Sequence, residues 1–99
     1  MPLLTRLLHD LADLGEIDDR PHLGGWELRI GGKAFALVQG DRVWLRTDRT
    51  TRLDFQRRGS TPFAPNPSMP LGRFYEVPAE VLRDADTLRA WAKKALGTQ

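Results

Sequence analysis

The sequence predicts an α+β fold in which N-terminal, middle and C-terminal helices pack on an antiparallel β-sheet. Amphipathic segments at the two ends of the chain predict the first and last helices. Between them, three apolar runs are separated by the pairs Gly31-Gly32 and Gly40-Asp41, which predict a meander of two hairpins. A length of 99 residues suits one hydrophobic core, so we expect one domain over residues 1–99.

The first helix is expected over residues 3–14. Its leucines recur at intervals of three and four residues, which places them on one helix face. Gly15 follows where a left-handed cap ends a helix without a Cβ clash. A weaker edge strand is expected over residues 17–22, because the adjacent Asp18 and Asp19 would discourage uncontrolled pairing.

The meander strands are expected at residues 26–30, 34–38 and 43–47. Residues 34–38 are apolar at every position, as in a strand covered on both faces, so this strand is predicted to be central. Along the third strand, apolar side chains alternate with Arg42, Trp44 and Arg46, which therefore share the opposite face. Trp26 and Trp91 fit core positions by their periodicity.

The second half of the chain alternates helices, a loop and one more strand. A short arginine-rich helix over 50–58 would begin at Asp48 or Thr50 and end at Gly59. Four prolines predict a loop with at most a brief strand over 61–70. A last strand is expected over 73–77 and a short helix from Pro78. The final helix should begin after Asp84 as N-cap and end at Gly97.

Composition narrows the classes of function. The formal net charge is only +2, but residues 26–73 hold nine basic and four acidic side chains, so the middle of the chain is the basic part. The absence of cysteine rules out disulfides, thiolate ligands and a thiol nucleophile. Charged residues interrupt the leucine-rich start, so neither a signal peptide nor a membrane span is predicted, and we expect a cytoplasmic protein with no membrane partner.

No motif in the sequence predicts an active site, a cofactor or a metal. Gly32-Lys33 lacks both the earlier glycine and the following hydroxyl of a phosphate-binding loop. His9 and His22 are the only histidines, and neither has a second ligand at metal-binding spacing. Neither histidine is placed to form a triad with Ser60 or Ser68. The sequence therefore favours a protein that is not an enzyme.

The arginines of the middle segment are the strongest candidates for a binding surface, with Trp44 as an exposed aromatic anchor. They would contact phosphates or an acidic protein surface, unless their interspersed aspartates make them an ordinary solvated face. Trp44 would instead be covered if the helix over 50–58 packs on it, and Phe63 is either a plug into the core or an interface residue. The candidate partner-binding residues are Arg42, Trp44, Arg46, Arg49, Arg52, Arg57 and Arg58.

The order of these features resembles the TfoX N-terminal domain family, also called Sxy, over about residues 20–97. The resemblance implies an α+β fold with an antiparallel sheet packed by helices, and no catalytic residues. It also implies a regulatory role in bacterial natural competence, together with the cyclic-AMP receptor protein and the transcription machinery. Residues that carry the resemblance are Leu23-Gly24-Gly25, Phe35-Ala36-Leu37-Val38, Val43-Trp44-Leu45-Arg46, Arg52, Phe55, Gly59, Pro62-Phe63, Tyr75-Glu76-Val77-Pro78 and Trp91-Ala92.

Two departures from the family pattern shape the functional expectation. The family tends to have Met-Phe-Gly-Gly where this chain has His22-Leu23-Gly24-Gly25. Its full regulators carry a second, C-terminal helical domain, which we do not expect in this protein because the sequence reaches Gln99 just after the first domain. We therefore expect a stand-alone domain that acts as a regulatory or protein-interaction module. Its partner would be a transcription regulator or polymerase component; the alternative is direct binding of nucleic acid, and self-association is left open.

Overall fold

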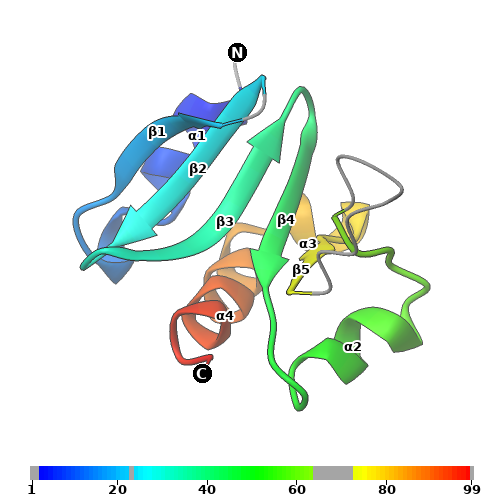
Figure 1. Ribbon diagram of the computed structural model, residues 1–99. Helices are drawn as coiled ribbons and strands as arrows, with labels where there is room; N and C mark the ends of the chain where they lie inside the picture. The colour runs from blue at the N-terminus through cyan, green and yellow to red at the C-terminus, as the bar shows by residue number, and fades with distance from the viewer. Residues whose placement is uncertain (1–2, 23, 64–72, 99) are drawn as a thin grey trace.

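The computed structural model describes residues 3–22, 24–63 and 73–98, which form a five-stranded antiparallel sheet with its helices (Figure 1). The strand order follows the sequence, so each strand pairs with the one before it. This confirms the predicted α+β class and the hairpin meander with a later strand. The strands are β1 (Asp18–His22), β2 (Gly25–Ile30), β3 (Lys33–Gln39), β4 (Arg42–Arg46) and β5 (Phe74–Glu76).

The central position of β3 agrees with its continuous apolar sequence. Its side chains from Phe35 to Val38 are all buried, as expected for a strand covered on both faces. A bulge between β2 and β3 leaves Phe35 without a direct partner, because Leu28 pairs with Ala36 and Arg29 pairs with Ala34. The bulge lets both Phe35 and Ala36 contribute to the same hydrophobic core.

The helices begin and end close to the predicted boundaries, with small shifts. The first helix is α-helical as α1 (Leu3–Asp10) and then tightens into the 3-10 turn η1 (Ala12–Leu14). The middle helix is shorter than expected. Pro78 precedes the third helix as its N-cap residue rather than being its first helical residue. The remaining helices are α2 (Arg52–Arg57), α3 (Ala79–Leu82) and α4 (Ala85–Leu96).

The main core lies between one face of the sheet and the helices (Figure 1). Helix α4 packs on β3 and β4, and α3 packs against α4. The guanidinium of Arg6 on α1 donates a hydrogen bond to the carbonyl of Leu82, and Arg89 Nε donates to the carbonyl of Asp10 at 3.3 Å. These bonds tie the first helix to the C-terminal helices across most of the sequence.

Helix α4 starts as the sequence predicts, at the Asp84 N-cap. The Asp84 side chain accepts hydrogen bonds from the Asp86 amide and from the Thr87 hydroxyl, the latter at 2.6 Å. The Thr87 hydrogen bond lowers the pKa of Asp84 below its ordinary value, because it stabilises the carboxylate form. The perturbed acid is thus a helix cap on the surface.

Two further residues differ from their predicted roles. Gly15 was expected to be a left-handed cap, but its φ of 143° and ψ of −177° belong to an extended region that essentially only glycine enters. Trp26 was expected in the core, yet 36% of its surface is exposed. It lies on β2 opposite Val38 and Pro21, and it is absent from the apolar cluster that the helices cover.

Candidate functional site

The seven candidate binding residues do not form one continuous surface. Three of them lie on β4, one lies in the loop that follows, and three lie along or just after α2. Their surroundings differ in burial, in carboxylate partners and in the hollow that they line. The structure therefore divides the predicted surface into parts that must be considered separately.

Trp44 is buried rather than exposed, so its predicted role as a surface anchor is wrong. Only 7% of its surface is accessible, and its ring meets that of Phe63 edge to face at a centroid distance of 5.0 Å. With Leu37 they form a second apolar cluster, against which Phe74 packs. The covering ring comes from Phe63 and not from the middle helix, so the plug interpretation of Phe63 is confirmed.

The backbone explains why Phe63 reaches this position. The Phe63 amide donates to the carbonyl of Phe74 at 2.7 Å, and the Glu76 amide donates to the carbonyl of Thr61 at 3.0 Å. Residues 61–63 thus run beside β5 as the brief strand-like segment that the sequence allowed, with an isolated bridge between Pro62 and Tyr75. This pairing carries the Phe63 side chain over Trp44.

Replacing Phe63 by alanine should uncover Trp44 and lower the free energy of unfolding by about 3 kcal/mol, since an aromatic ring leaves a buried site. Tryptophan fluorescence should shift to longer wavelength while the protein is still folded. The matched control, Leu53→Ala, removes an exposed apolar side chain and should change neither quantity appreciably. An unchanged emission maximum in the Phe63 variant would show that other groups cover Trp44.

Three of the arginines are engaged by carboxylates. Arg42 pairs with Glu76 at 3.0 Å across β4 and β5. At the end of α2, Arg58 pairs with Glu80 at 3.3 Å and lies 5.2 Å from the centre of the Trp91 ring, whereas Arg57 is 3.9 Å from Asp54. Exposed pairs of this kind stabilise a fold by no more than about 1 kcal/mol, but they lower the positive charge offered to a partner.

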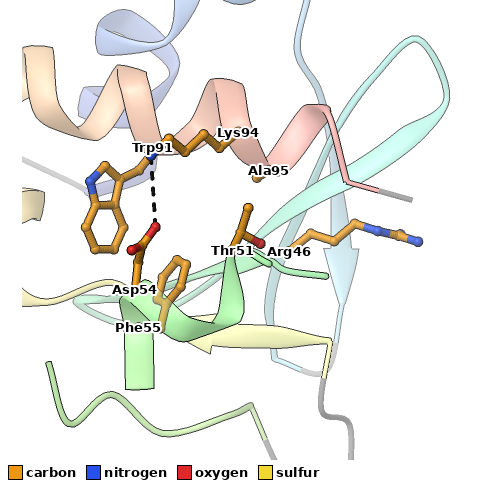
Figure 2. A pocket seen from close by; sticks show the side chains of 7 residues that line it. All are labelled: Arg46, Thr51, Asp54, Phe55, Trp91, Lys94 and Ala95. Carbon is orange, nitrogen blue, oxygen red and sulfur yellow. Dashed lines mark ion pairs between the residues drawn. The ribbon is translucent and has the colours of Figure 1, made fainter. Parts of the chain in front are cut away.

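Arg46 borders a narrow gap between α2 and α4 (Figure 2). Phe55 and Trp91 meet there edge to face at 4.8 Å, and Lys94 lies 3.9 Å from Asp54. The cavity volume is about 10 Å³, which holds at most one water molecule. Figure 2 shows the guanidinium of Arg46 directed away from Asp54 and Phe55, so this gap is a packing defect rather than a ligand site.

The remaining two candidates, Arg49 and Arg52, line an open hollow of about 430 Å³ next to the end of β4. A third arginine, Arg73, joins them there, although the sequence pattern did not indicate it. The antiparallel register of β4 and β5 pairs Arg46 with Phe74, so the residue before Phe74 lies beside Thr47. Only knowledge of this pairing could have brought Arg73 into the candidate site.

A network of hydrogen bonds holds the backbone around the hollow. Thr47 donates to the carbonyl of Arg73 through both its amide, at 2.6 Å, and its hydroxyl, at 3.0 Å. The Asp48 carboxylate accepts from the amides of Thr50 and Thr51 at 2.9 Å each, which satisfies donors in the turn before α2. The residue that immediately precedes α2 is Thr51, so neither predicted start, Asp48 or Thr50, is the N-cap. Asp48 instead stabilises the turn that leads into the helix.

The described residues offer little for other kinds of chemistry. Within residues 3–22, 24–63 and 73–98, no group of three or more His, Cys, Asp and Glu side chains is arranged to hold a metal ion. No helix in these ranges has the length and apolar character needed to cross a membrane.

The sequence model of a family described as the TfoX N-terminal domain matches residues 9–98, which is nearly the whole chain. No curated protein matches the chain. The match includes β4, α2, Arg73 and the second apolar cluster, so the candidate site lies within the region shared with that family.

Proposed function

The chain belongs to the TfoX N-terminal domain family, and on that basis we propose that it is a non-enzymatic regulatory module that binds another protein. The observation that supports this role is the group of arginines at the end of β4 and the start of α2, around the hollow. Arginine is enriched at interface hot spots because its planar guanidinium forms several directed hydrogen bonds at once. The partner would be an acidic surface of a transcription regulator or of a polymerase component.

The arrangement of the arginines supports a protein partner over direct binding of nucleic acid. Binding along the phosphate backbone of a DNA duplex is favoured by many basic side chains without acidic side chains beside them. Each phosphate contact adds to affinity because it releases counterions. Here Arg42, Arg57 and Arg58 have carboxylate partners, so among the candidate arginines in the described part of the chain only Arg46, Arg49 and Arg52 carry charge without an ion pair. Direct DNA binding remains the alternative proposal, and it predicts an affinity that falls steeply with salt.

Reversing the charge of Arg49 and Arg73 should reduce partner recovery at least about tenfold, which corresponds to about 1.4 kcal/mol. Both side chains are exposed, so the double variant Arg49→Glu/Arg73→Glu should fold normally. Tagged protein would be used to capture partners from bacterial cytosol with and without nuclease treatment. Mass spectrometry would identify the partners, and circular dichroism would check folding.

The matched control is Arg20→Glu/Arg83→Glu, which makes the same change in net charge at exposed arginines on β1 and after α3. A transcription protein captured by the natural chain and by this control, but not by the test variant, would support the proposal. Equal recovery by both variants would move the interface away from the hollow. Recovery that disappears on nuclease treatment would favour nucleic acid instead.

A further inference from the structure

The arginines around the hollow differ from most others in the chain because they lack carboxylate partners. Of twelve arginines, seven lie within 4.0 Å of an Asp or Glu oxygen. Among the residues that the structure describes, five arginines have no such ion pair, and three of the five, Arg49, Arg52 and Arg73, line the hollow. The other two are Arg46 and Arg83. Unpaired arginines drawn together at one place leave positive charge available to a ligand.

We propose that the hollow lined by Arg49, Arg52 and Arg73 is a binding site for the phosphate group of a phosphate monoester. This inference rests on the proposed function only in treating the hollow as the anchor point for a partner. It adds the chemistry of the ligand. The phosphate would be carried either by a small molecule, such as a nucleotide, or by a phosphorylated side chain.

The three arginines are held by the same short piece of backbone. Arg73 is fixed to the end of β4 by the two hydrogen bonds from Thr47. Arg52 donates its amide to the carbonyl of Asp48 at 3.1 Å, and Arg49 lies within the turn that Asp48 stabilises. Because the backbone is fixed before any ligand arrives, binding orders only the side chains.

The charge of the hollow suits an anion with more than one negative charge. Three guanidinium groups and the Asp48 carboxylate give it a formal charge of +2. Asp48 would oppose an anion, but its Oδ1 already accepts hydrogen bonds from two amides and the Thr51 hydroxyl. A phosphate monoester carries a charge of about −1.5 to −2 at pH 7 and three acceptor oxygens, which complements the forked donors of arginine.

Arg52 provides a second observation. Its Nε is buried and has no hydrogen-bond partner within the part of the chain that the structure describes. Arg46 Nε is buried without a partner in the same way. A buried N–H without an acceptor is unfavourable, and if the Arg52 side chain turned toward an oxyanion in the adjoining hollow, this N–H would gain one. The Thr50 side chain, which lines the same hollow, would offer a further donor.

The dimensions favour a single phosphate over a nucleic-acid backbone. A volume of about 430 Å³ accommodates a phosphate and a small attached group. Beyond the hollow, the carboxylates of Asp54 and Glu80 accompany the arginines at the far end of α2. A duplex laid along this surface would meet those acids, whereas a single phosphate seated between Arg49 and Arg73 would avoid them.

The test is an NMR titration of the isotope-labelled chain, with inorganic phosphate as the first probe and sodium chloride at equal ionic strength as the reference. Saturable shifts should appear at the amides of residues 47–52 and 73. In Arg49→Gln/Arg73→Gln the affinity should fall at least about tenfold, since two charge-assisted contacts are lost. The control is Arg57→Gln on α2, the helix that begins at Arg52, because Arg57 pairs with a carboxylate. This variant should bind phosphate as the natural chain does.

Adenosine monophosphate and a phosphoserine peptide would then be titrated to identify the source of the phosphate. Tighter binding of the nucleotide would assign a small-molecule site, and tighter binding of the peptide would assign a phosphorylated partner. Shifts no larger than those in chloride, or equal affinity in the double variant, would overturn the phosphate site. If the chain captures its partner but does not bind phosphate, the proposed function stands and the phosphate site is rejected. If the chain binds phosphate but captures no partner, only the proposed function is rejected.

Discussion

Replacing Phe35 by alanine is expected to lower the free energy of unfolding by about 4–5 kcal/mol. The side chain has no exposed surface and lies on the central strand, where the bulge directs it into the main core. Neighbouring strands on both sides restrict collapse around the vacated volume, so a cavity should remain. A domain of this size commonly has a total stability of about 5–15 kcal/mol, and the variant should therefore be close to unfolding.

Urea denaturation followed by circular dichroism would measure this loss. The control is Leu53→Ala on α2, where 47% of the residue surface is exposed and a change within about 0.5 kcal/mol is expected. At a low temperature where both variants are folded, phosphate titration should give the same affinity for each, because neither change reaches the hollow. A cost below about 1 kcal/mol at Phe35 would mean that the core repacks around the gap.

Local sequence signals were sufficient for most of the fold. Hydrophobic periodicity located the terminal helices, and the glycine-containing pairs located the hairpin turns, because these signals depend on backbone geometry over a few residues. The continuous apolar run from Ala34 to Val38 gave the central strand for the same reason. The Asp84 cap followed from the match between a short acidic side chain and unpaired helix amides.

The two tryptophans on the sheet show where such reasoning stops. Alternation along β2 and β4 correctly indicated that neighbouring side chains point to opposite faces, but it did not show which part of each face is covered. Trp26 is exposed because the apolar cluster does not extend to it, and Trp44 is buried because residues 61–63 return beside β5. Both outcomes depend on contacts between segments far apart in the sequence.

The candidate site was predicted in part for a similar reason. The sequence drew attention to the arginines between residues 42 and 58, but it could not distinguish those with carboxylate partners from those without. Glu76 and Glu80, which pair with Arg42 and Arg58, lie more than twenty residues away. Arg73 enters the hollow only through the pairing of β5 with β4. The hollow is therefore a property of the tertiary structure.

Replacing Gly25 by alanine is expected to destabilise the protein by about 3 kcal/mol or more, beyond what a turn glycine would explain. A Cβ built at this position overlaps the carbonyl oxygen of Val38 and lies 2.7 Å from Cγ of Gln39. Since the first obstacle is backbone on the central strand, a change of side-chain rotamer cannot relieve it. The start of β2 would have to move away from β3.

The neighbouring glycine supplies the matched control. Gly24 has a φ of 82°, and no atom lies within 4 Å of the place that a Cβ would occupy there. Gly24→Ala should therefore lower the free energy of unfolding only by the energy of holding alanine in a left-handed conformation, about 1–2 kcal/mol. Amide hydrogen exchange should show weakened protection at Trp26 and Val38 in the Gly25 variant alone. Equal costs for the two variants would mean that both glycines serve the turn. A larger loss of stability in the Gly25 variant would show that Gly24 serves the turn, whereas Gly25 permits β2 and β3 to approach each other.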